Sequence, residues 1–222
     1  MANGEPEKIR MPFYEKRQYK GVFRLPATGS KLEAIWHDAY YYAAKRLIDG
    51  VARGEYLPAQ EGIAGLYAFR HHLELALKYV IFHSRGLKDA TTNARLEDIE
   101  DVKKTHSLST LWNLAKTECQ RIIPSSEWDA VDTAYVEQAV REFDAIDPNG
   151  ERFRYVGASV GVEKDPVKRQ AMNRQISHNA YIDFNELVQV VEHTHEILDY
   201  LDIYMVETHA QNEEWEEILR SF

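Results

Sequence analysis

Apolar residues recur every three or four positions through several long stretches of the chain, which is the spacing of amphipathic helices. Between these stretches lie turn residues, such as the Asp-Pro-Asn-Gly sequence that ends at Gly150. We find no internal repeat. The pattern predicts an all-α fold, an antiparallel helical bundle of about five long helices with one irregular insertion before the last helix. The expected helices cover about 30–54, 60–84, 106–123, 125–146 and 183 to at least 206.

In two segments the apolar residues show no sustained helical spacing. Residues 1–29 contain three prolines and are expected to form an irregular N-terminal arm. Residues 151–182 are the least regular part, and a short hairpin between Arg152 and Val162 is the only sheet expected. More than half of the chain should be helical. The predicted organisation is therefore an arm at 1–29, a helical domain at 30–210 that includes the insertion 151–182, and an acidic C-terminal extension at 211–222.

The net charge of −9 is unevenly distributed. Residues 183–222 contain 11 acidic residues and one basic residue, Arg220. This end of the chain is expected to face solvent or a basic protein partner rather than phosphate groups. Residues 151–178 reverse the balance, with six basic and three acidic residues. That stretch is the better candidate for binding a polyanion, and the alternative is a solvated basic loop.

Several classes of protein are excluded or disfavoured by absences in the sequence. No apolar run approaches the ~20 residues that cross a bilayer, and no apolar secretory segment follows Met1, so a cytoplasmic protein without membrane contact is expected. The single cysteine, Cys119, excludes an intrachain disulfide and a cysteine-rich zinc site. No glycine-rich phosphate loop, nucleophile elbow or HExxH motif is present.

The paired histidines do not suggest a metal site. His193 and His195 are two positions apart on a predicted helix, and His71 and His72 are adjacent, so within each pair the side chains diverge. We therefore expect ordinary helix histidines, with no metal and no cofactor.

The strongest candidate site lies on the second predicted helix. Arg70, Glu74 and Lys78 are four positions apart and share one face. The surrounding residues are apolar on several sides, so this helix should be central and its charges should be paired. We predict that Arg70 is largely buried and paired. A structural polar network and a binding or catalytic site are both open. The candidate binding residues are Arg70, Glu74, Lys78, His106, Arg152 and Arg154.

Three segments carry a resemblance to a known family. They are RHHLELALKYVIF (Arg70–Phe82), THSLSTLWNLA (Thr105–Ala115) and FDAIDPNGERFRY (Phe143–Tyr155). Together they resemble HEPN-like bacterial proteins, all-helical domains named for nucleotide binding in higher eukaryotes and prokaryotes. The resemblance covers roughly 32–205. It implies an up-and-down helical bundle, dimerisation and association with RNA, often in toxin–antitoxin or phage-defence settings.

Catalytic members of that family carry an arginine followed, after four to six residues, by a histidine near the last long helix. Here Arg174 and His178 are separated by three residues and precede the last predicted helix. The resemblance implies that Arg174 would hold the phosphate and His178 would exchange the proton.

The shortened spacing makes a non-catalytic or degenerate HEPN-like domain the leading hypothesis. Such a domain would bind RNA, a nucleotide or a protein partner as a homodimer. A metal-independent endoribonuclease and a purely structural interaction module, whose acidic last helix binds a basic partner, are the alternatives. Whether the protein is an enzyme is left open at this point.

Overall fold

The protein folds into a bundle of helices in the computed structural model, which describes residues 36–85, 102–148, 150 and 181–220. Within these ranges most residues are helical and none is in a strand, so the all-α prediction is confirmed. The elements are α1 (Trp36–Ala52), the π-helix η2 (Pro58–Gly62), α2 (Ile63–Ser84), α4 (Leu108–Ile122), α5 (Ser125–Trp128), α6 (Ala134–Ile146) and α9 (Phe184–Arg220).

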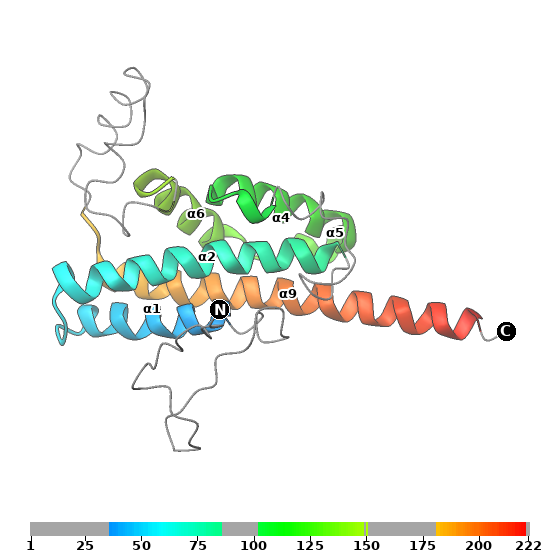
Figure 1. Cartoon of the computed structure of the whole chain (residues 1–222), viewed down its shortest axis with the longest axis horizontal. Coiled ribbons are helices and arrows are strands. Elements are labelled where there is room, and N and C mark those ends of the chain that lie inside the picture. Colours follow the sequence, from blue (N-terminus) through cyan, green and yellow to red (C-terminus); the bar gives the residue numbers. More distant parts are fainter. Residues whose placement is uncertain (1–35, 86–101, 149, 151–180, 221–222) are drawn as a thin grey trace, which may run out of the picture.

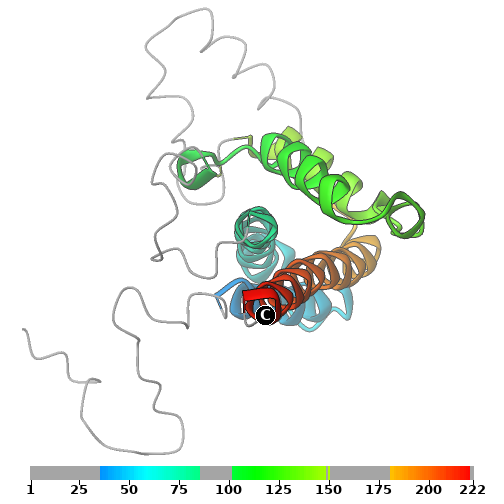
Figure 2. The ribbon, with the colours of Figure 1, turned by 90° about the vertical axis from the view of Figure 1, so that its right-hand side faces the viewer.

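Helix α2 is at the centre of the arrangement. It packs against α1, α4 and α9, while α6 packs against α4 and α9 (Figures 1 and 2). Helices α2 and α9 run in the same direction, because Phe184 lies against Gly62 at one end and His209 lies near Ser84 at the other. The central position follows from the sequence, since α2 has apolar residues on several sides and buries most of them.

The core extends from α2 into the layer formed by α4 and α6. Leu111, Trp112 and Cys119 of α4 are buried, and Val136 and Phe143 of α6 face the same interior. Burial raises the pKa of the Cys119 thiol to about 12, with a smaller contribution from the nearby acids Glu118 and Asp202. Cys119 is therefore a protonated, apolar core residue at neutral pH.

The boundaries of two helices differ from the predicted ones. The expected helix at 125–146 is two helices, because α5 ends at Trp128 and α6 begins at Ala134. The carboxylate of Asp132 accepts a hydrogen bond from the backbone N–H of Ala134 at 3.1 Å, and this local bond starts α6 afresh. Helix α9 continues without a break past residue 210 to Arg220, so the acidic extension belongs to the last helix.

Among the residues that the structure describes, no helix combines the length and apolar composition needed to cross a membrane. The predicted arm at 1–29 and the predicted hairpin between Arg152 and Val162 lie outside the described residues.

Candidate functional site

Arg70, Glu74 and Lys78 lie in a row along α2 and are buried together. Their side chains are 2%, 3% and 10% exposed. Glu74 Oε2 accepts a hydrogen bond from Arg70 Nη1 at 3.0 Å, and Glu74 Oε1 accepts one from Lys78 Nζ at 2.8 Å. The prediction that Arg70 is buried and paired is confirmed. We call these three residues, together with His106, the α2 polar network.

His106 completes the network from the segment that precedes α4. Its Nδ1 lies 2.9 Å from Glu74 Oε1, so one carboxylate oxygen is shared by Lys78 and His106. Unlike the other three members, the His106 side chain is 49% exposed. The network therefore reaches from the interior of the bundle to its surface at one residue.

Backbone carbonyl groups satisfy the remaining donors of the two buried cations. Arg70 donates from Nε to the carbonyl O of Asp147 at 3.3 Å and from Nη2 to the carbonyl O of His106. Lys78 donates to the carbonyl O of Lys103 at 3.1 Å. These acceptors come from the end of α6 and from the segment before α4, so α2 holds both segments through charge-assisted hydrogen bonds.

Gly150 allows the chain after α6 to pass close to Arg70. Its φ is +70°, and a Cβ atom at this position would lie 3.2 Å from Arg70 Nη2. A side chain at position 150 would therefore be strained by its backbone conformation and crowded by the guanidinium.

The ionisation of Glu74 reflects two opposing influences. Burial is the largest single influence and raises the pKa of Glu74, but Lys78, His106 and Arg70 together hold that pKa below its ordinary value. Glu74 is therefore ionised at neutral pH, as its three hydrogen-bonding partners on α2 and in the segment before α4 require. A buried carboxylate is stable here because cations surround it.

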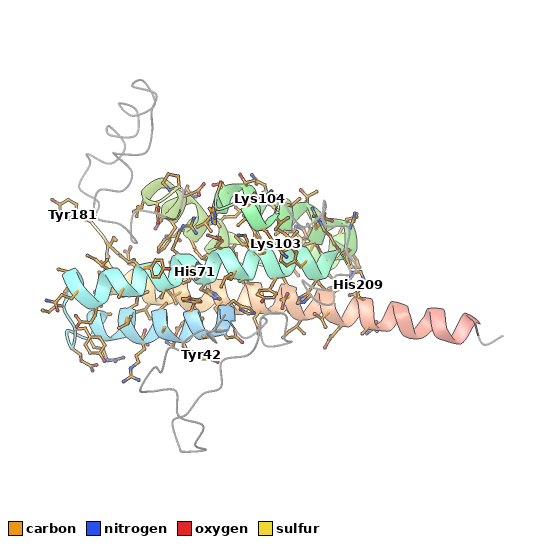
Figure 3. The ribbon with its side chains drawn as sticks, in the orientation of Figure 1. Tyr42, His71, Lys103, Lys104, Tyr181 and His209 are labelled. Carbon is orange, nitrogen blue, oxygen red and sulfur yellow. The ribbon has the colours of Figure 1, made fainter. Side chains whose placement is uncertain are left out.

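Two exposed lysines precede His106 along the chain. Lys104 and Lys103 are exposed two and three residues before it, and Figure 3 shows both on the side of α2 that carries α4. Ser107 then caps α4 by accepting a hydrogen bond from the backbone N–H of Thr110. We call Lys103, Lys104 and His106 the His106 rim. An imidazole fixed by a buried carboxylate and flanked by lysines can bind an anion or exchange a proton.

An open groove of about 520 Å³ lies between α4 and α6, and its lining includes Ser109 near the start of α4. Trp112 and Val140 form apolar parts of its lining, and Lys116 pairs with Glu137 at 2.8 Å in the same groove. Its other acidic residue, Asp144, accepts hydrogen bonds from the backbone N–H groups of Leu108 and Ser109 at the start of α4. The volume lies in the range of small-ligand sites.

A second polar cluster lies on another side of α2, where α1 and α9 approach it. His37, His72 and His195 come from three helices, and Tyr41 stacks on His195 with ring centroids 3.6 Å apart. We call these four residues the histidine cluster. His72 is fully buried, and its Nδ1 lies 2.9 Å from the carbonyl O of His37.

Burial favours the neutral form of two members of the histidine cluster, His72 and His195. Burial lowers the pKa of His72 to about 3, and the neighbouring His195 and His37 lower it further against the opposing effect of the His37 carbonyl. Burial also lowers the pKa of His195, although Asp199, Asp38 and Glu196 act in the other direction. No group of three or more His, Cys, Asp or Glu side chains in the described residues has a geometry that could hold a metal ion.

The structure brings together only part of the predicted site. Arg70, Glu74, Lys78 and His106 meet, whereas the other four candidates lie outside the described residues. Those four are Arg152, Arg154, Arg174 and His178. The sequence analysis missed Lys103 and Lys104, although the run Lys-Lys-Thr-His-Ser directly before a helix cap was a usable indication.

No family model, no curated protein and no solved structure matches this chain. The resemblance to HEPN-like proteins therefore rests on the three sequence segments given above.

Proposed function

We propose that this protein is a non-catalytic HEPN-like domain that binds RNA through the His106 rim. The observation that carries the proposal is the half-exposed imidazole of His106, fixed by the buried Glu74 and flanked by the exposed Lys103 and Lys104. Dimerisation and a role in bacterial toxin–antitoxin or phage-defence systems are part of the same proposal, and both come from the HEPN resemblance.

Two physical features favour a phosphate-bearing polymer at this surface. Lysine and protonated histidine side chains neutralise phosphates and release condensed counterions, which supplies most of the affinity for a nucleic acid. The groove between α4 and α6 begins at the same end of α4 and has room for a nucleoside. The basic stretch 151–178 follows α6, and its six basic residues add to the expected attraction.

The non-catalytic assignment rests on how the buried charges are used. Arg70 and Lys78 both donate to Glu74 and to backbone carbonyl groups, so their charges already serve the fold. Neither cation is placed to stabilise a reacting phosphate. Of the four network members only His106 is half-exposed, and neither buried cation is available beside it as the second half of an acid–base and electrostatic pair.

Fluorescence anisotropy with a labelled single-stranded RNA of about 20 nucleotides tests the proposal. The wild-type protein should bind, and log K should fall linearly with log salt. The Lys103→Ala/Lys104→Ala variant should bind about tenfold more weakly, equivalent to about 1.4 kcal/mol. Its salt slope should be smaller by about 1.4, since each lost phosphate contact removes about 0.7 for a single strand. His106→Ala should weaken binding further.

The matched control removes two exposed cations elsewhere, in Arg53→Ala/Arg121→Ala. An equal loss in that variant, or no binding by the wild type, would contradict the proposal. The same RNA should stay intact in chelator. Cleavage by the wild type that falls about 10²-fold in Arg174→Ala and in His178→Ala would instead establish the endoribonuclease alternative.

A further inference from the structure

Helix α9 is much longer than the bundle to which it belongs. Its 37 residues span about 55 Å at 1.5 Å per residue, whereas the neighbouring α2 has 22 residues. His209 Nε2 lies 3.3 Å from the carbonyl O of Ser84, the last residue of α2. Beyond this contact, residues 210–220 continue as a helix past the end of the bundle (Figures 1 and 3).

An apolar stripe follows α9 from the bundle into the projecting segment. Tyr200 is 46% exposed, and its ring lies 6.1 Å from that of Tyr204 on the next turn. Tyr204 packs against the core and donates to Glu127 Oε2 at 3.0 Å. Trp215, Ile218 and Leu219 come 11, 14 and 15 residues after Tyr204. These separations correspond to about three and four helical turns, so the five positions share one face of the helix.

The rest of the projecting segment is acidic. Residues 207–220 contain five glutamates and a single arginine, Arg220. None of the glutamates occupies a position on the apolar stripe. The segment is therefore amphipathic, with one apolar face and strongly negative flanks.

We infer that the α9 stripe, from Tyr200 to Leu219, docks a basic amphipathic helix from another protein. A helical segment of 11 residues is marginally stable in water by itself, and an apolar partner would stabilise it. Helix-in-groove recognition uses apolar anchors at this three- and four-residue spacing.

The negative charge on the flanks of the α9 stripe determines which kind of partner can bind there. A second copy of this chain would bring an equally acidic α9 and a net charge of −9 to the contact. An anionic membrane surface would also repel the glutamates. A basic helix places lysine or arginine beside them, which steers association and favours the correct register. This surface is separate from the His106 rim, so the inference does not depend on RNA binding.

Binding of a defined peptide tests the inference with the full chain. The probe is a labelled peptide of about two heptads made of lysine, leucine and alanine, with leucine at three- and four-residue spacing. It should bind the wild type and bind more weakly as salt rises from about 0.05 to 0.3 M. Trp215→Ala/Leu219→Ala should weaken binding at least about tenfold. The control Tyr42→Ala/Leu57→Ala, which changes exposed apolar residues elsewhere, should bind like the wild type.

Each contrary result has a distinct meaning. Equal binding of a scrambled peptide of the same composition would reduce the interaction to charge alone and overturn the inference, as would no binding. A dimer in light scattering that Trp215→Ala/Leu219→Ala dissociates would assign the stripe to a second copy. The unfolding midpoint of that variant should match the wild type, because its substitutions lie on the projecting part of α9, beyond His209. A lower midpoint would place Trp215 or Leu219 in the bundle itself.

Discussion

Helix α2 buries polar side chains on two sides, and the two sides differ in how the polar groups are stabilised. In the α2 polar network, Arg70 and Lys78 donate to the Glu74 carboxylate and to three backbone carbonyl groups, and these cations help to hold the pKa of Glu74 below its ordinary value. In the histidine cluster, His72 is equally buried but meets one carbonyl group and other aromatic rings, and its pKa falls to about 3.

The difference shows what determines the protonation of a buried group. Removing a charge from water costs several kcal/mol unless opposite charges and hydrogen bonds replace the lost hydration. The network has such partners from three segments of the chain, so it stays ionic. Among the described residues no acidic side chain lies within hydrogen-bond distance of His72, so this histidine stays neutral.

The largest expected effect on stability comes from the α2 polar network. Arg70→Ala should lower the free energy of unfolding by about 3–5 kcal/mol, because Glu74 and the carbonyl groups of His106 and Asp147 lose their donor inside the bundle. Urea denaturation followed by circular dichroism measures this. Arg53→Ala, at an exposed arginine that pairs with Glu55, should change the value by less than about 0.5 kcal/mol. Equal effects of the two substitutions would show that the network adds nothing to stability.

The next effect comes from the histidine cluster and appears in the pH dependence of the free energy of unfolding. His72 has a pKa of about 3 in the folded protein and about 6.5 when unfolded, so the unfolded chain binds the extra proton between these values. Stability should be unaffected above about pH 7 and should fall by about 2 kcal/mol by pH 5. The lowered pKa of Glu74 adds a further loss only at lower pH, as the pH falls through and below the ordinary pKa of a carboxylate.

His72→Asn isolates this contribution, because asparagine does not titrate. The variant should be less stable than the wild type at neutral pH but should lose less stability between pH 7 and 5. His193→Asn, at an exposed histidine, is the matched control and should keep the pH dependence of the wild type. An unchanged slope in His72→Asn would assign the acid sensitivity to another group.

A smaller effect tests the contact between Gly150 and Arg70. Gly150→Ala should cost about 2 kcal/mol, from the left-handed backbone and from crowding of the guanidinium. Gly54→Ala has nearly the same φ, +73°, but no heavy atom within 4 Å of the added Cβ, and should cost only about 1 kcal/mol. In an Arg70→Ala background the difference between the two glycine substitutions should vanish. If it persists, Gly150 is constrained by something other than Arg70.

The smallest effect is expected beside the histidine cluster. Thr194 is fully buried on α9, and its Oγ1 has no hydrogen-bond partner among the described residues. Thr194→Val keeps the shape and removes the hydroxyl, so stability should rise by up to about 1 kcal/mol. Thr208→Val removes a hydroxyl that donates to the carbonyl O of Tyr204 and should not stabilise. A clear destabilisation by Thr194→Val would mean that this hydroxyl is satisfied in solution.

The sequence predicts the network better than the cluster, because the two depend on different ranges of interaction. Arg70, Glu74 and Lys78 are four positions apart on one helix, so their mutual pairing is visible from local spacing. The backbone carbonyl groups that accept from Arg70 and Lys78 cannot be predicted in this way, since a carbonyl group carries no sequence pattern. The sequence correctly predicts that the side chains of His72 and His195 diverge from those of His71 and His193. Their meeting, however, depends on how three helices pack, and no local pattern encodes that.

The same distinction applies to the fold. Periodicity predicts the long helices and the central place of α2, because burial on several sides is a local property of that segment. It does not predict the break between α5 and α6, where the Asp132 carboxylate competes for a backbone N–H group. The predicted catalytic pair, Arg174 and His178, lies outside the described residues and stays a prediction.

The buried thiol of Cys119 has a consequence for following the motions of this protein. Because the chain has one cysteine, and because burial raises its pKa to about 12, a disulfide reagent can react only when α4 separates from its neighbours. The rate of thiol labelling under native conditions therefore measures how often the layer of α4 and α6 opens. No label has to be engineered, and the same measurement compares the opening of Arg70→Ala with that of the wild type.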